Sequence, residues 1–204
     1  MKEKNQALKY LPIVTKEEWN QLDDTQKKIT IAKDVLARIQ SKNFFPKTNG
    51  FLKFENKGIV ELKEIFNTTE CEGCARGGIF CSYIGINNDL KLKLKSTTNI
   101  ILEGCVSSNM RSEYHFKKDQ EIRDLFERKQ ITLIEATFEG IDVINENEYL
   151  IGTYYNNEFI NDETDWDRDE LTDLIENFRN DLTSKEILIK IMNNIINNNG
   201  VFKL

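Results

Sequence analysis

The stretch that decides the fold is ECEGCARGGIFCSYIG, which spans residues 70–85. Small and apolar side chains dominate it, and threonines stand directly before it. A threonine can cap a helix, and Glu70 and Glu72 would then lie in the first turn, where the helix dipole favours negative charge. We therefore expect residues 70–84 to form one helix that is mostly buried.

The glycine pair Gly77–Gly78 lies in the middle of this expected helix. Each glycine in a helix interior costs about 1 kcal/mol relative to alanine. Something must offset that cost, most simply a neighbouring backbone that packs closely against the glycine face. A structural reason for the pair is favoured over a ligand.

The cysteines in the same stretch raise the question of a metal. A structural zinc site needs four ligands, usually in two close pairs. Cys71 and Cys74 make one pair, and Cys81, Cys105 and His115 are the candidates to complete it, but they form no second CxxC or HxxxH motif. We predict no structural metal and no cofactor, with zinc on these four cysteines as the runner-up. Redox chemistry at Cys71 and Cys74 is a third reading, disfavoured because nearby glutamates raise thiol pKa values.

Composition limits the function classes. The chain has 204 residues, 39% of them hydrophobic and 30% charged, with a net charge of -6. An acidic balance argues against a basic surface that binds nucleic acid. No apolar run reaches the roughly 18 residues of a membrane span, and the start of the chain is charged. These features predict a cytoplasmic protein without a membrane segment.

Helical signals recur along the rest of the chain. Thr15 and Glu18 have capping-box spacing, as do Thr183 and Glu186 before the last helix. Apolar residues at helical period predict further helices, and Pro46 with Asn49–Gly50 predicts a turn or hairpin. The expected helices cover residues 25–40, 59–66, two segments within 119–140, 169–180 and 183–199.

These signals indicate a predominantly helical α+β fold with a few short strands, in a single compact domain over residues 1–204. Residues 1–14 are expected to be flexible, and residues 145–168 to form a variable region of loop or strand. The alternating leucines within DLKLKLK leave residues 88–106 open between strand and helix.

Two catalytic or metal-binding readings are weak. Carboxylates from Asp165 to Glu176 match positions of a calcium loop, but Glu170 stands where that loop needs glycine. An acidic helix start explains them better. His115 is the only histidine, and no phosphate-binding or dinucleotide motif occurs. An enzyme that uses His115 with dispersed carboxylates is therefore the alternative function.

Four segments resemble a family of small uncharacterised bacterial and bacteriophage proteins. They are IAKDVL, CEGCARG, LIEATFE and IMNNIINNNGVF, which follow the patterns IAKDVL, CxxCAxG, LIExxFE and IMxNIIxNxGxF between Ile31 and Phe202. Cys81 and Cys105 lie outside these patterns. The resemblance implies a phage or mobile-element protein and assigns no role to any residue.

The function we expect is a non-enzymatic, cytosolic binding protein of phage or mobile-element type. Inhibition of a host antiviral defence system through protein contact is one form of it. Aromatic anchors beside acidic groups suit a partner with a basic surface. The candidate contact residues are Tyr154, Tyr155, Phe159, Asp162, Asp165, Trp166 and Asp167. The competing reading is that these aromatics fold back onto the core.

Overall fold

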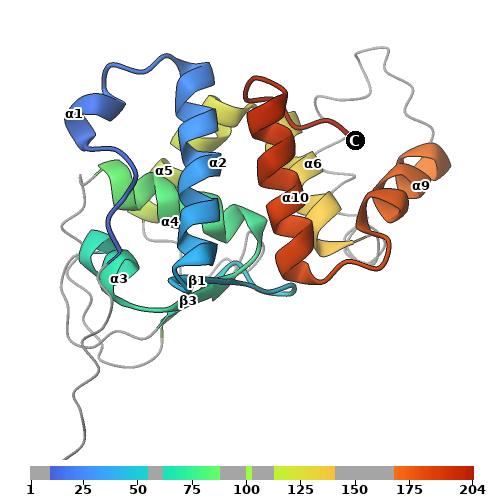
Figure 1. Cartoon of the computed structure of the whole chain (residues 1–204), viewed down its shortest axis with the longest axis horizontal. Coiled ribbons are helices and arrows are strands. Elements are labelled where there is room, and N and C mark those ends of the chain that lie inside the picture. The colour runs from blue at the N-terminus through green and yellow to red at the C-terminus, as the bar shows by residue number, and fades with distance from the viewer. Residues whose placement is uncertain (1–9, 55–61, 88–99, 103–112, 141–167) are drawn as a thin grey trace, which may run out of the picture.

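The computed structural model describes residues 10–54, 62–87, 100–102, 113–140 and 168–204 (Figure 1). Its fold is α+β and predominantly helical, as predicted. The helices are α1 (Lys16–Trp19), α2 (Asp24–Gln40), α3 (Leu62–Thr68), α4 (Ala75–Asn87), α5 (Glu113–Phe126), α6 (Arg128–Glu139), α9 (Arg168–Arg179) and α10 (Ser184–Asn197). The strands are β1 (Phe44–Pro46), β2 (Leu52–Phe54), β3 (Cys71–Gly73) and β4 (Ile100–Leu102). That the chain forms a single domain stays a prediction.

Helices α2 and α10 lie side by side at the centre of the molecule (Figure 1). Each begins at a capping box, in which two residues three positions apart each accept the backbone N–H of the other with their side chain. Asp23 and Gln26 form the box of α2, and Thr183 and Glu186 form that of α10. The box at Thr15 and Glu18 is also present, so both predicted boxes are confirmed.

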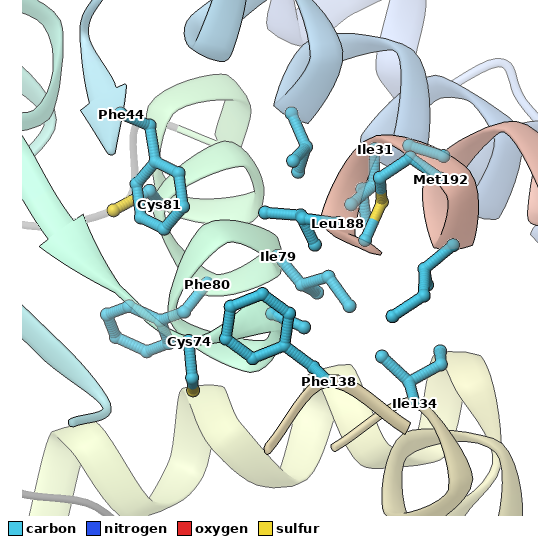
Figure 2. Close-up of a cluster of buried hydrophobic side chains, with 14 of the residues drawn as sticks. Ile31, Phe44, Cys74, Ile79, Phe80, Cys81, Ile134, Phe138, Leu188 and Met192 are labelled. Atoms are coloured by element: carbon cyan, nitrogen blue, oxygen red, sulfur yellow. The ribbon is translucent and has the colours of Figure 1, made fainter. Parts of the chain in front are cut away.

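The core forms where α2, α4, α6 and α10 meet. Figure 2 shows Ile31 of α2, Ile79 of α4, Phe138 of α6 and Leu188 of α10 pointing toward one another. Their side chains are completely buried. Burial of such side chains stabilises a fold by about 1.5–3 kcal/mol each, so this contact carries much of the folding energy.

The sheet has the strand order β1-β3-β2-β4. Strand β1 runs parallel to β3, whereas β2 pairs antiparallel with both β3 and β4. The turn at Asn49–Gly50 therefore does not close a hairpin, although the sequence pattern allowed one. The connection from β1 to β2 has to cross two strand spacings, about 10 Å, because β3 lies between these two strands in the sheet. Both edges of β3 then find backbone partners.

The prediction of one helix over residues 70–84 is wrong at its start. Cys71–Gly73 is the strand β3, and the helix begins only at Ala75. Glu70 and Glu72 thus lie outside the helix rather than in its first turn. Cys74 lies between the strand and the helix, and its N–H donates to the carbonyls of Gly50 and Phe51, at 2.9 and 3.3 Å. Its Sγ then accepts the N–H of Gly77 at 3.4 Å, as an N-cap side chain does.

The glycine pair of α4 has a structural reason, as predicted. A β-carbon at Gly77 would overlap the carbonyl oxygen of Phe51, a backbone atom that cannot swing aside as the end of a flexible side chain can. A β-carbon at Gly78 would lie 3.2 Å from the ring of Phe44. Close approach of β1 and the following turn to α4 therefore offsets the helical cost of both glycines.

The remaining helix predictions agree with the structure. Two helices occupy residues 113–139, and Gly140 ends the second with a positive φ of 95°. Helix α9 runs through Asp173 and Glu176, so this half of the calcium template is helix rather than loop. Residues 100–102 form a strand, which decides that part of the open segment. The leucines at 90–94 lie outside the described residues. In the part of the chain that is described, every helix is too short or too polar to cross a membrane.

Candidate functional site

The first polar feature of the core is the guanidinium of Arg38, of which 1% is exposed. Its Nε donates to Asp34 one helical turn earlier, at 2.7 Å. Nη1 donates to the side-chain oxygen of Asn43 and to the carbonyl of Phe66, both at 2.7 Å, and Nη2 donates to Asn67 at 3.1 Å. One guanidinium thus joins α2, the start of β1 and the end of α3.

The segment before α1 is tied to this network through Tyr10. Its hydroxyl donates to Asp34 Oδ1 at 2.7 Å, and its ring covers the guanidinium of Arg38, whose Cζ lies 4.3 Å from the ring centroid. The N–H of Ile13 also donates to Asp34, at 3.1 Å. Burial, followed by the charge of Asp34, raises the pKa of the Tyr10 hydroxyl. That hydroxyl therefore stays a neutral donor.

This network holds elements together and offers no open reactive atom. Both charged side chains are at most 1% exposed, and the carboxylate is shared among Tyr10, Ile13 and Arg38. Sequence reasoning missed it. The available signal was two opposite charges, Asp34 and Arg38, spaced i, i+4 beside the apolar stripe of α2.

A second polar cluster, partly open to solvent, lies where α4, α6 and the turn after β1 meet. We call Arg76, Glu135, Glu139 and Asn49 the carboxylate cluster. Arg76 Nη1 lies 3.5 Å from Glu135 Oε2, and the two side chains are 4% and 31% exposed. Glu139, one turn after Glu135, accepts the N–H of Asn49 at 2.8 Å. Arg76 also lies over the ring of Phe51, with its Cζ 5.6 Å from the centroid.

The surroundings of Glu139 raise the pKa of its carboxyl above the ordinary value. Burial is the main cause of the raised pKa of this carboxyl, and the charge of Glu135 raises it further. The hydrogen bond from Asn49 and the charge of Arg179 act in the opposite direction. A carboxyl with a raised pKa close to a second carboxyl is an arrangement that acid–base chemistry uses.

Arg179 connects this region to α9. Its Nη1 donates to the carbonyls of Thr137, at 2.9 Å, and of Phe138. These are carbonyls of the last turn of α6, which lack helical partners. A β-carbon at Gly140 would lie 3.0 Å from the same guanidinium. Arg179 thus caps α6 and fixes α9 against it.

The three described cysteines are buried free thiols that belong to two separate environments. Cys74 Sγ donates to the carbonyl of Phe51 at 3.7 Å, and burial raises its pKa well above the usual value. Cys71 is buried on β3, and its Sγ donates to the carbonyl of Thr69 at 3.7 Å. Burial raises the pKa of Cys81 on α4 well above its usual value, and the interaction with Cys71 raises it further. The CxxC pair is therefore divided between two sets of partners. Among the described residues no three histidine, cysteine or acidic side chains gather as metal ligands, and Cys105 lies outside them.

The partner-binding residues predicted from the sequence lie outside the described part of the chain. These are Tyr154, Tyr155, Phe159, Asp162, Asp165, Trp166 and Asp167. His115 lies on α5, but its side chain is likewise not described. The helix that directly follows the segment is described. On α9, Ile175 and Phe178 are buried, whereas Asp173 and Glu176 are exposed.

Comparisons with protein families, with curated proteins and with solved structures find no match to this chain. The resemblance to bacterial and bacteriophage proteins described above therefore stays a prediction.

Proposed function

We propose that this chain is a protein-binding module that acts without catalysis, through an acidic surface centred on α9. The observation that carries the proposal is the charge of that surface. Between Leu171 and Asp181, every exposed charged side chain is a carboxylate: Asp173, Glu176 and Asp181. The one cation of this stretch, Arg179, is turned toward the carbonyls of α6.

The packing of α9 supports this role. Ile175 and Phe178 hold its inner face, and Arg179 fixes it to α6, so the outer face is presented on a rigid element. A rigid surface loses little conformational entropy when it binds. Figure 1 shows α9 at one end of the molecule, beyond α6 and α10.

The chemistry of the partner follows from this charge. Carboxylates at an interface steer association with a basic surface. Salt screens the charges, so this attraction weakens as the salt concentration rises. The segment with Tyr155 and Trp166 precedes α9 in the chain and adds aromatic anchors of the kind that dominate binding energy. The predicted resemblance to bacterial and bacteriophage proteins supports the proposal of a partner in a bacterial host, with a component of an antiviral defence system as the favoured target.

The test compares two charge variants of equal size. The α9 variant is D173N/E176Q/D181N, and the matched control is E17Q/E64Q/E70Q, which neutralises three exposed carboxylates on other elements. Pull-down from the host lysate supplies the partner, which is then purified. We expect the α9 variant to lose about tenfold in affinity at low salt, with a flatter salt dependence, and the control to bind as the wild type does.

Equal affinities for both triple variants would remove α9 from the interface. The aromatic part of the proposal is tested separately with Y155A/W166A. Retained helical content by circular dichroism together with lost binding supports an anchor role. Loss of the fold in this variant would instead assign the two aromatics to the core.

An enzyme is the second candidate, and Glu139 is the observation that favours it. Its raised pKa beside Glu135 makes it the best general acid among the described carboxylates. A screen of ester, phosphate and glycoside substrates would test this function. Turnover that disappears in E139Q and persists in E176Q would support the enzyme, whereas turnover that survives in E139Q would exclude this residue as its acid.

A further inference from the structure

Residues 201–204 follow α10, and side chains of two helices hold their backbone. Asn194 of α10 hydrogen-bonds both backbone groups of Lys203, since its Nδ2 donates to the carbonyl at 2.7 Å and its Oδ1 accepts the N–H at 2.9 Å. Gln130 of α6 accepts the N–H of Phe202 through Oε1, at 2.7 Å. Figure 1 shows this end of the chain, marked C, beside α10 and α6.

The side chains of this segment differ in their surroundings. Phe202 is 1% exposed, and its ring meets that of Phe178 on α9 edge to face, with the centroids 5.5 Å apart. Leu204 also packs against the core, whereas Val201 and Lys203 are exposed. An aromatic and an aliphatic side chain two positions apart therefore anchor the segment, and the residue between them is held by its backbone alone.

The amide of Asn194 is oriented by its own helix, independently of residues 201–204. The Nδ2 of Asn198 donates to the carbonyl and to Oδ1 of Asn194, at 2.9 and 3.0 Å. Oδ1 is thereby fixed as the acceptor for the N–H of Lys203, and Nδ2 as the donor to its carbonyl. Backbone hydrogen bonds combined with contacts to alternate side chains are the means by which peptide-binding sites recognise an added segment.

We propose that Gln130, Phe178 and Asn194 form a peptide-docking site, into which a partner protein inserts a segment with an aromatic residue, any residue and then an aliphatic residue. The chain's own residues 201–204 identify this chemistry, because they show which side chains fit and which backbone groups are bound. The site is separate from the acidic outer face of α9, since Phe178 lies on the inner face of that helix.

The chain's own segment competes with such a partner. It is attached through Asn199 and Gly200, whose positive φ angles of 54° and 84° turn the chain at the end of α10. A segment on so short a tether has an effective concentration of about 1 mM or more at its site. A partner segment must therefore bind more tightly than residues 201–204 or be held nearby by other contacts. Removal of the Phe202 ring should open the site.

The test uses the full-length chain and a labelled, end-blocked peptide NGVFKL, which copies residues 199–204. Because F202A removes the competing ring, fluorescence polarisation should show this variant binding the peptide about tenfold more tightly than the wild type does. A peptide with alanine in place of phenylalanine should not bind. A peptide with alanine in place of lysine should bind as its parent does, because Lys203 is exposed.

Two variants of α10 test the backbone contacts. In the F202A background, N194A should weaken binding of the peptide about tenfold, because it removes both hydrogen bonds to the lysine backbone. N193A, on the exposed side of the same helix, is the matched control and should leave the affinity unchanged. If circular dichroism shows that F202A does not fold, F202L replaces it, since leucine keeps an apolar side chain in the core.

Four results would overturn the proposal. Three of them are a folded Phe202 variant that binds no peptide at about 1 mM, equal affinities of this variant and the wild type, and binding that N194A leaves unchanged. The fourth is a wild-type dimer in sedimentation velocity that dissociates in the Phe202 variant, which would make a second copy of the chain the occupant instead of a partner protein.

Discussion

The guanidinium of Arg38 occupies the space that a side chain at Gly85 would need. A β-carbon there would overlap Nη2 of Arg38 and would lie 3.3 Å from the side-chain oxygen of Asn67. Arg38 is held by Asp34, Asn43 and the carbonyl of Phe66, so it has no alternative position. The absence of a side chain at position 85 of α4 is therefore a condition for the buried network of α2.

Replacement of this glycine tests that relationship. G85A should lower the free energy of unfolding by about 2 kcal/mol, because the gain in helix propensity is smaller than the cost of overpacking. Urea denaturation measures the change. G50A is the matched control, since a β-carbon at Gly50 meets no atom within 4 Å. Equal stabilities for the two variants would show that the network adapts.

The buried ion pair provides a second prediction. R38M leaves the carboxylate of Asp34 buried without its cation, which should cost about 3–5 kcal/mol. D34N/R38M should cost less than the sum of the two single variants, because each single change leaves the other group uncompensated. Lys33 lies on the exposed side of α2, so K33M is the control. Additive costs in the double variant would contradict a coupled pair.

Glu139 predicts a dependence of stability on pH. Its pKa is raised in the folded state above the ordinary value of 4.5, so the folded protein binds this proton more tightly than the unfolded chain does. The ionised carboxylate therefore opposes folding at neutral pH, and this cost disappears as the pH falls through the raised pKa to 4.5.

We expect E139Q to be more stable than the wild type at pH 7, because glutamine carries no charge and its oxygen still accepts the N–H of Asn49. The difference should shrink as the pH falls through the raised pKa of Glu139 toward 4.5. Thermal unfolding across this range is the measurement, with E176Q, on the exposed face of α9, as control. A difference that grows on acidification would reverse the sign of the argument.

The last helix is predicted to be a principal part of the core. Ile191 of α10 is completely buried, so I191D places an unpaired charge among apolar side chains and should cost several kcal/mol. N193D, two residues away on the exposed side, should change the melting temperature little. A melting temperature of I191D equal to that of the wild type would exclude α10 from the core.

Local signals predicted the helices well because a helix satisfies most of its hydrogen bonds within one segment. Apolar spacing located α2 and α9, and the Thr183–Glu186 box located the start of α10. The strand β3 was missed because three residues carry too little periodicity to be recognised. Its partners come from segments well before it in the chain, because β1 begins at Phe44 and β2 at Leu52, whereas β3 begins at Cys71.

The candidate sites depended still more on tertiary structure. The sequence shows Cys71 and Cys74 as neighbours in a CxxC motif, whereas the fold gives their sulfurs separate partners, the carbonyl of Thr69 for Cys71 and that of Phe51 for Cys74. Nothing in the sequence distinguishes Glu139 from the other acidic residues, since its raised pKa comes from burial and from Glu135.

The sequence by itself determined the helical class, the starts of the helices that have a capping box, and the acidic character of the chain. Those properties depend on residues within a few positions of one another or on a simple sum of charges. Only the tertiary structure decided the strand order, the environment of Arg38 and the separate hydrogen-bond partners of Cys71 and Cys74. Each of these features joins groups from separate segments of the chain. The interactions between such groups stabilise the protein only after folding has brought the groups together and removed them from water.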